Sequence, residues 1–227
     1  MTRNRIVAFV PMRHDSERVP GKNYRPIHGR ALFHYILETL LACPEINQVV
    51  VDTDSPVIME GLRAHFPQVT LLERPIHLRA GTVSMNEVLL YDIGQCPGDL
   101  YLQTHSTNPL LRSETVSRAI QSLGAAQSVH DSLFSVTRRQ VRLWDERGRG
   151  VNHDPTVLLR TQDLPPLFEE NSSLYLFTGE TLKTRRTRIG ERPMMFETNP
   201  EDSWDIDTEF EFAIAEFLLA RRRGEKS

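Results

Sequence analysis

Three basic side chains, Arg13, Arg18 and Lys22, stand close together near the start of the sequence. They follow an apolar run at residues 6–10, which predicts a buried strand. In open α/β sheets, ligands bind at loops that leave the carboxyl ends of strands. Because Gly21 precedes the lysine, the backbone can also approach a ligand closely. The pattern predicts a polyphosphate site.

This loop differs from the common phosphate-binding motifs. The sequence G-x-x-x-x-G-K-[ST] would require an earlier glycine, and Ser or Thr at the position of Asn23. No G-x-G-x-x-G is present either. The alternative is a solvated surface loop. Its position after a strand, between Pro11 and Pro20, favours a binding site.

A pair of carboxylates near the end of the chain could hold a metal ion. Asp205 and Asp207 are one residue apart, so on an extended backbone both side chains point the same way. Two carboxylates suit Mg²⁺, which takes its remaining ligands from water and substrate phosphates. The alternative is that Asp207 caps the following helix and Asp205 faces water.

Strand and helix patterns alternate through residue 137, which predicts βαβ units and a mostly parallel sheet. Residues 138–171 lose this periodicity and are expected to form a long excursion from the sheet. Residues 208–219 predict a helix with a Thr208–Glu211 capping box and with Phe210, Ile214, Phe217 and Leu218 buried. Strands are expected over 6–10, 48–52, 69–72, 100–104, 133–136, 174–177 and 194–197, and further helices over 31–41, 56–65, 83–93 and from residue 113.

Length and composition indicate one ordinary globular domain over residues 1–227. A formal charge of −3 gives no reason to expect nucleic acid as a partner. Cys43 and Cys96 lack metal-ligand spacing and are expected to be free thiols. No apolar run approaches the ~20 residues that span a bilayer, and the N-terminus has no signal-peptide pattern. We therefore expect no membrane association and a cytoplasmic location.

Residues 13–23 read Arg-x-x-Ser-x-Arg-x-Pro-Gly-Lys-Asn. After a strand that ends in proline, this resembles the signature loop of the acylneuraminate cytidylyltransferase family, the CMP-sialic acid synthetases and their CMP-Kdo-forming relatives. Family members more often read Arg-Gly-Gly-Ser-Lys there. Here His14 and Asp15 replace the two glycines, and Arg18 lies near the family's lysine.

Four further stretches resemble the family in the same order along the chain. Residues 73–75 with 82–84 look like its cytosine-side motif, and 103–112 like its Leu-Gln-Pro-Thr-Ser-Pro-Leu-Arg, with His105 replacing a proline. Residues 160–175 are similar to its Arg-Gln-x-Leu-Pro and Glu-Asn-Gly-x-x-Tyr, with Ser172 replacing the glycine, and 203–209 to its metal motif. The resemblance implies nucleotide contacts from Arg13, Ser16, Arg18, Lys22, Asn23, Arg74 and Ser84. It implies contacts to the acceptor substrate from Gln103, Arg160, Asn171 and Tyr175. Asp205 and Asp207 would bind the metal, and these two residues would act in catalysis with Arg13 and Lys22.

The resemblance also implies a Rossmann-like three-layer α/β/α fold and a cytidylyltransferase. Such an enzyme uses CTP and Mg²⁺ to transfer CMP to an acidic acceptor, here a sialic-acid-like nonulosonic acid, and releases pyrophosphate. It further implies a homodimer in which residues 138–171 pack against the second copy. Two alternatives stay open: a different acid, such as a Kdo-type sugar or an acidic phosphonate, and a catalytically silent nucleotide-binding subunit.

Overall fold

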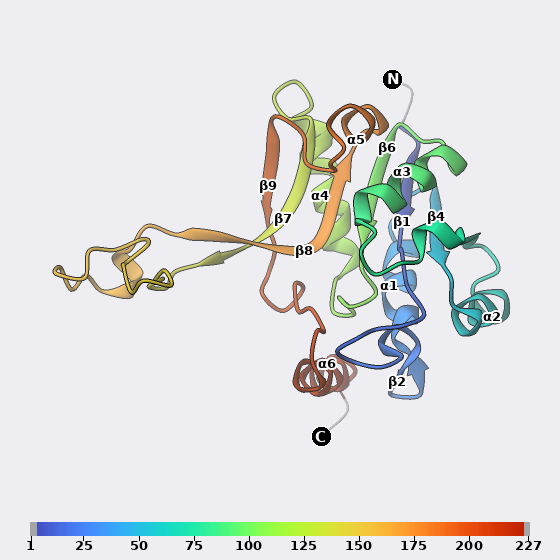
Figure 1. The fold of residues 1–227 in the computed structure, drawn as a ribbon, viewed down its shortest axis with the longest axis horizontal. Helices are drawn as coiled ribbons and strands as arrows, with labels where there is room; N and C mark the ends of the chain where they lie inside the picture. Colours follow the sequence, from blue (N-terminus) through green and yellow to red (C-terminus); the bar gives the residue numbers. More distant parts are fainter. Residues whose placement is uncertain (1–3, 225–227) are drawn as a thin grey trace.

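A computed structural model describes residues 4–224, and its centre is a seven-stranded sheet (Figure 1). The strand order is β5-β4-β1-β6-β8-β7-β9, in which β8 alone runs antiparallel to its neighbours. The expected mostly parallel sheet is therefore confirmed. The strands are β1 Ile6–Phe9, β4 Gln48–Thr53, β5 Thr70–Glu73, β6 Leu100–Thr104, β7 Ser132–Arg139, β8 Leu167–Phe177 and β9 Pro193–Glu197, and a separate hairpin pairs β2 Pro26–Ile27 with β3 Arg30–Ala31.

Helices cover both faces of this sheet. Successive residues of a strand point to opposite faces. Accordingly, Ile6 and Ala8 of β1 join a core cluster with the first, second and fourth helices, whereas Val7 and Phe9 join one with the third and fifth. The expected three-layer α/β/α arrangement is confirmed. The helices are α1 Leu32–Leu41, α2 Pro56–His65, α3 Met85–Gln95, α4 Ser113–Ala125, α5 Gly179–Arg185 and α6 Glu209–Arg222.

Helix α6 forms where expected, but the predicted buried face is only partly right, because Leu218 packs against the core whereas the two predicted phenylalanines do not. Phe212 and Leu219 are buried, whereas Phe210 is 74% exposed and Phe217 also faces outward. The helix packs on Leu32 and Tyr35 at the start of α1, and this contact selects the face that is buried. Apolar residues occur on more than one side of α6, so their spacing alone did not determine its rotation.

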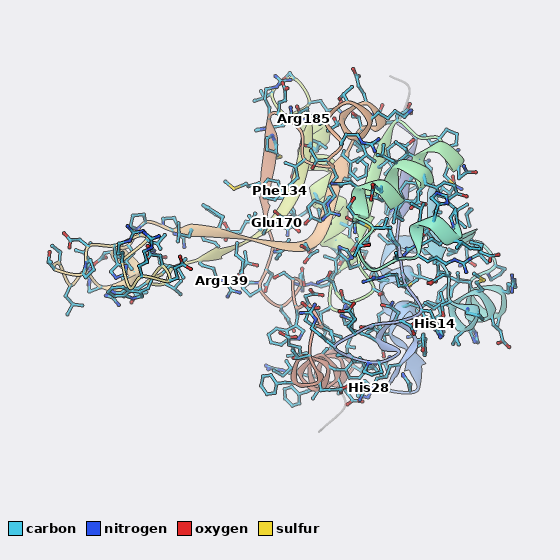
Figure 2. All side chains as sticks on the ribbon, viewed as in Figure 1. His14, His28, Phe134, Arg139, Glu170 and Arg185 are labelled. Carbon is cyan, nitrogen blue, oxygen red and sulfur yellow. The ribbon has the colours of Figure 1, made fainter. Side chains whose placement is uncertain are left out.

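Residues 138–171 form part of a long hairpin arm, which Figure 1 shows extending away from the sheet. The expectation of an excursion is confirmed, but its boundaries were wrong, because β7 continues to Arg139 and β8 already begins at Leu167. Register pairs such as Arg138 with Phe168 hold the arm together. Figure 2 shows Arg139 on the arm, beyond Phe134 and Glu170 near its base.

Two simpler expectations concern the cysteines and the membrane. Cys43 and Cys96 are both buried free thiols, as predicted. In the part of the chain from residue 4 to residue 224, no helix has the length and apolar character needed to cross a bilayer.

Candidate active site

A cleft of about 450 Å³ opens at the carboxyl ends of β1, β5 and β6. Three segments that were predicted to bind ligands meet there: the loop after β1, the loop after β6 and the segment before α6. A hollow of about 580 Å³ lies between α1 and α2, but none of the predicted site residues lines it. The predicted residues that line the cleft are Arg13, Ser16, Arg18, Lys22, Asn23, Arg74, Asp205 and Asp207.

The loop after β1 is anchored at both ends. The Asn23 amide donates to the Arg13 carbonyl, and its oxygen accepts from Ser106 at 2.7 Å, which ties the loop to β6. His14 turns toward the loop after β4, where its backbone N–H donates to Asp54 and its ring stacks on Tyr24. The residue that replaces the family's first glycine thus supports the loop and leaves Arg13 exposed beside the cleft.

The structure shows why residue 21 is a glycine, which the sequence only partly indicated. Its φ of 64° lies in the left-handed region that favours glycine. A β-carbon at this position would also lie 2.8 Å from the Tyr24 ring. The glycine therefore allows the turn that directs Lys22 into the cleft.

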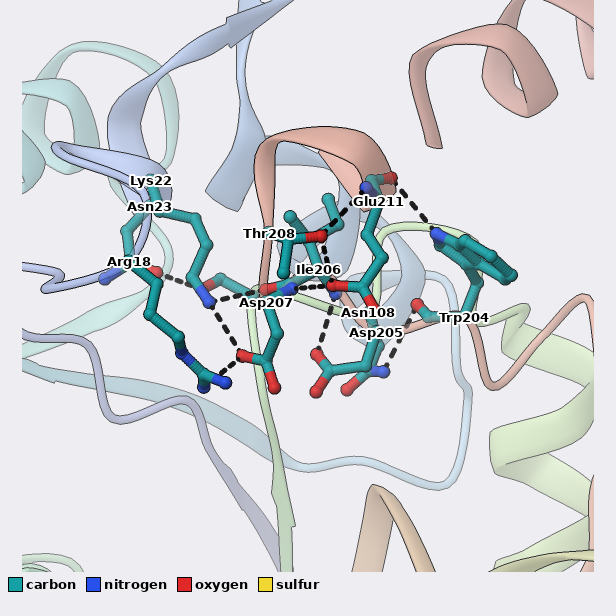
Figure 3. A network of polar contacts seen from close by, with 11 residues as sticks. Arg18, Lys22, Asn23, Asn108, Trp204, Asp205, Ile206, Asp207, Thr208 and Glu211 are labelled. Atoms are coloured by element: carbon teal, nitrogen blue, oxygen red, sulfur yellow. Dashed lines mark hydrogen bonds and ion pairs between the residues drawn. The ribbon is translucent and has the colours of Figure 1, made fainter. Parts of the chain in front are cut away.

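Lys22, Arg18 and Asp207 form one charged cluster, shown in Figure 3. Asp207 accepts from Arg18 at 2.6 Å and from Lys22 at 3.3 Å, and Lys22 also donates to the Ile206 carbonyl. Lys22 is almost fully buried, with 10% of its side chain exposed, and Arg18 is mostly exposed. Lys22 consequently joins the loop after β1 to the predicted metal segment.

The helix-cap reading of Asp207 is wrong. Thr208 is the N-cap of α6, and its hydroxyl accepts from the Glu211 N–H. The Glu211 carboxylate accepts from the Asp207 N–H, one residue before the cap, and not from the cap's own N–H as a capping box requires. The Asp207 side chain is therefore available to the cleft.

Asp205 and Asp207 point to the same side of their segment (Figure 3), as their spacing predicted. The intervening Ile206 is fully buried, and its N–H donates to the Thr107 carbonyl at 3.0 Å. This anchor fixes both carboxylates on the cleft side. Burial raises the pKa of Asp205, and the nearby Asp207 raises it further. A cation at this position would offset that cost.

Arg74 lines the cleft, but its side chain is buried and is held in place by a carboxylate. Its guanidinium forms an ion pair with the fully buried Asp52, which in turn lies beside Asp92 on α3. Burial and the Asp52 charge raise the pKa of Asp92 to about 8. One proton shared by the two carboxyl groups balances the single charge of Arg74.

The buried carboxyl pair predicts how stability depends on pH. Between about pH 4 and pH 8, Asp92 keeps its proton in the folded protein and loses it in the unfolded chain. The free energy of unfolding should therefore fall as pH rises through this window. Asn cannot ionise, so Asp92→Asn should show a weaker fall in urea unfolding measured at pH 6, 7 and 8.

A suitable control for this pH dependence is Asp154→Asn, since Asp154 lies exposed on the arm. This variant should keep the pH dependence of the parent. Equal slopes for Asp92→Asn and the parent would contradict the shared proton.

Ser84 does not line the cleft, although it was predicted to bind nucleotide. It is the N-cap of α3, in a reciprocal capping box with Glu87. Its neighbours Val83 and Met85 line the cleft in its place. Residues 82–84 therefore lie beside the cleft as expected, but the Ser84 hydroxyl caps helix α3.

The structure brings together only some of the residues that were predicted to bind the acceptor substrate. Gln103 on β6 and Tyr175 on β8 are register partners, and both are buried behind the cleft. Asn171 hydrogen-bonds Thr137 and Thr198 and lines a neighbouring hollow that also reaches Asp205. Arg160 lies on the arm in an ion pair with Asp163 and does not line the cleft of its own chain.

Ser172, which stands where the family has glycine, has a φ of 56°. This left-handed conformation explains the glycine in the family motif. The hydroxyl groups of Ser172 and Tyr175 are hydrogen-bonded at 3.0 Å, and Ser172 lines the cleft. The sequence showed that Ser172 replaces the family's glycine, but its contact with Tyr175 was not predicted.

His105 was also noted as a departure but was not predicted to be a site residue. Its ring lines the cleft and contacts the Gln103 amide nitrogen at 3.0 Å. Burial, with a smaller contribution from the positive charges of Arg188 and Lys22, lowers the pKa of His105 to about 4. The imidazole is therefore neutral near pH 7.

The cytidylyltransferase family model matches residues 7–218. An N-acylneuraminate cytidylyltransferase of Oncorhynchus mykiss is 27% identical over 229 residues, or 95% of this chain and 50% of that protein. A CMP-N,N'-diacetyllegionaminic acid synthase of Legionella pneumophila is 27% identical over 230 residues, or 95% of this chain and 96% of that protein. The chain thus spans about half the length of some curated relatives and nearly all of others.

Solved structures agree with the fold. A CMP:2-keto-3-deoxy-manno-octonic acid synthetase complexed with CTP matches with a TM-score of 0.73 at 17% identity, over 96% of this chain and 99% of that one. At this identity the likeness concerns the fold alone. Together with the family match over residues 7–218 and the named relatives, it confirms the resemblance carried by the motifs: the chain belongs to the cytidylyltransferase family and is similar to its acylneuraminate members.

Proposed function

We propose that this chain transfers CMP from CTP to an acidic acceptor, a sialic-acid-like nonulosonic acid, and releases pyrophosphate. The observation that carries the proposal is the cluster of Arg18, Lys22 and Asp207 in the cleft. It combines two cations suited to a polyphosphate with a carboxylate suited to a metal. The family match supports the nucleotide.

In the proposed reaction, an acceptor hydroxyl oxygen attacks the α-phosphorus of CTP. The bond from this phosphorus to the bridging oxygen breaks, pyrophosphate leaves and the hydroxyl proton is released. Such a reaction depends on positioning and charge neutralisation more than on covalent catalysis. Arg13, Arg18 and Lys22 would neutralise the triphosphate, while Asn23 holds their loop in place.

Mg²⁺ is the cofactor that the cleft residues fit. Asp205 and Asp207 would hold it, and when bound it neutralises charge on the phosphates. Within residues 4–224, no three or more His, Cys, Asp or Glu side chains are grouped to hold a metal. A site with two protein carboxylates fits Mg²⁺, since this ion takes other ligands from water and substrate phosphates.

The test is a pyrophosphate-release assay with CTP and Mg²⁺. The acceptor panel contains N-acetylneuraminate, N,N'-diacetyllegionaminate, Kdo and an acidic phosphonate, with ATP and UTP as control nucleotides. We expect turnover with CTP and a nonulosonic acid. Turnover with Kdo or the phosphonate alone would favour the alternative acceptor that the His105 departure keeps open. No turnover with any acceptor, together with CTP binding, would favour the silent subunit.

We also propose a homodimer formed through the arm. Its tip exposes apolar side chains, among them Trp144 and Leu158, which is 89% exposed. Exposed apolar patches of this kind are typical of interfaces. Arg160 on the same arm would then reach the cleft of the second chain, as the family resemblance implies.

Leu158→Asp should weaken this dimer, because it places a charge within the apolar tip. Sedimentation should show a dimer for the parent at micromolar concentrations, and a larger monomer fraction with lower activity for the variant. A parent that is monomeric and fully active would contradict the shared site.

A further inference from the structure

Two buried polar atoms near the acceptor end of the cleft have no partner within the described chain. They are Gln103 Oε1, a hydrogen-bond acceptor, and Arg188 Nη1, a donor. Burying a polar group without a hydrogen bond is costly. A pair of unsatisfied atoms with opposite roles therefore indicates a ligand that supplies both partners.

Arg188 lies in the segment between α5 and β9, and its guanidinium stacks on the Tyr175 ring at 3.7 Å from the centroid. No carboxylate between residues 4 and 224 forms an ion pair with it. Glu170, which contacts the same tyrosine, accepts from the Tyr175 hydroxyl. By contrast, Arg74 of the same cleft is paired with Asp52. A half-buried guanidinium without a counter-ion destabilises the ligand-free fold.

The positions of the neighbours place Arg188 at the acceptor end. Gln103 and Tyr175 are directly opposite in the β6–β8 register, so their side chains share one face of the sheet. The Tyr175 hydroxyl bonds Ser172, which lines the cleft. The charge of Arg188 also acts on His105, another lining residue. The guanidinium thus lies close to the lining residues, although Arg188 is not itself one of them.

We propose that Arg188 binds the carboxylate of the acceptor, beside Gln103, which the family resemblance already assigns to the acceptor. This inference rests on the proposed function and names the residue that would recognise its acidic group. A guanidinium matches a carboxylate with two parallel N–H···O bonds. The Tyr175 ring fixes the plane of the guanidinium before the acceptor arrives.

The experiment compares Arg188→Met with the parent on N-acetylneuraminate, N,N'-diacetyllegionaminate and Kdo, each as the free acid and as its methyl ester. Methionine keeps an apolar contact with Tyr175 but removes the charge. The acceptor KM should rise roughly tenfold to a hundredfold, the range for one charged hydrogen-bonding group, while the KM for CTP stays unchanged. The preference for the acid over the ester should fall by the same factor.

Melting temperature provides a second measurement that separates binding from structure. Removing an unpaired half-buried charge should leave the Tm of the ligand-free protein unchanged or higher. Arg185→Met is the matched control, since Arg185 is paired with Glu191 on the surface and appears in Figure 2 on α5, away from Glu170. It should keep the acceptor KM of the parent.

The outcomes separate this inference from the proposed function. If the parent turns over none of the acids, both are overturned. If the parent is active but Arg188→Met keeps its acceptor KM and its preference for the acid, Arg188 does not bind the carboxylate and the proposed function stands. A lower Tm with these unchanged kinetics would assign Arg188 a purely structural role.

Discussion

Asp205→Asn is expected to lower turnover by a factor on the order of 10² or more, because it removes one of the two carboxylates proposed to hold Mg²⁺. Its Tm should stay within a few degrees of the parent. Burial disfavours the Asp205 charge, and an asparagine oxygen can still accept from the Ile206 N–H. Pyrophosphate release over a Mg²⁺ titration and thermal unfolding measure the two effects.

Asp207→Asn should lower turnover by a similar factor but cost more stability. A helix cap would tolerate this change, since Asn caps about as well as Asp, but Thr208 is the cap here. The Asp207 carboxylate pairs with Arg18 and with the buried Lys22. A neutral amide oxygen can still accept a hydrogen bond, but it would leave the buried lysine without a counter-charge. The Tm of this variant should therefore fall below that of Asp205→Asn.

Glu209→Gln is the control for both variants. Glu209 stands in the first turn of α6 and pairs with Arg25 on the surface, and it does not line the cleft. Its turnover and Mg²⁺ dependence should match those of the parent. Near-normal, Mg²⁺-dependent turnover in both aspartate variants would place the metal elsewhere.

The central strands could be predicted because they are buried and therefore consist largely of consecutive apolar residues. Residues 100–104 were predicted with the observed bounds, and 48–52 missed only Thr53. The arm lacked this signal: β7 and β8 leave the sheet there, so both of their faces meet solvent and no alternation is required. The register between β7 and β8 depends on both strands together, so it cannot be seen in the sequence of either strand alone.

Much of the charged side of the cleft, where Lys22 and Asp207 meet, could also be predicted. Loops at the carboxyl ends of parallel strands meet at one sheet edge, so local motifs were enough to bring Lys22 and Asp207 together. The buried partners were missed. Asp52 ends an apolar strand, and an acid in that position was a usable signal, but its pairing with Asp92 depends on how α3 packs. Arg188 carried no local motif, and only its stacking on the Tyr175 ring in the folded chain reveals it.

Lys22→Ala is expected to weaken CTP binding by ~1.5–3 kcal/mol, or roughly tenfold to over a hundredfold, because one charged contact to phosphate is lost. The structure adds an effect on folding. Lys22 is buried, donates to the Ile206 carbonyl and pairs with Asp207, so its loss should also lower the free energy of unfolding. Isothermal titration with CTP and urea unfolding measure the two effects separately.

Arg18→Ala provides the comparison that separates binding from stability. It removes the other cation paired with Asp207, but 65% of the Arg18 side chain is exposed, and exposed ion pairs contribute little to stability. This variant should therefore bind CTP more weakly while unfolding at nearly the same urea concentration as the parent. Lys22→Ala should lose both affinity and stability, since Lys22 alone of the two joins the loop after β1 to the buried backbone of residue 206. A folded Lys22→Ala protein with the CTP affinity of the parent would remove this loop from the nucleotide site.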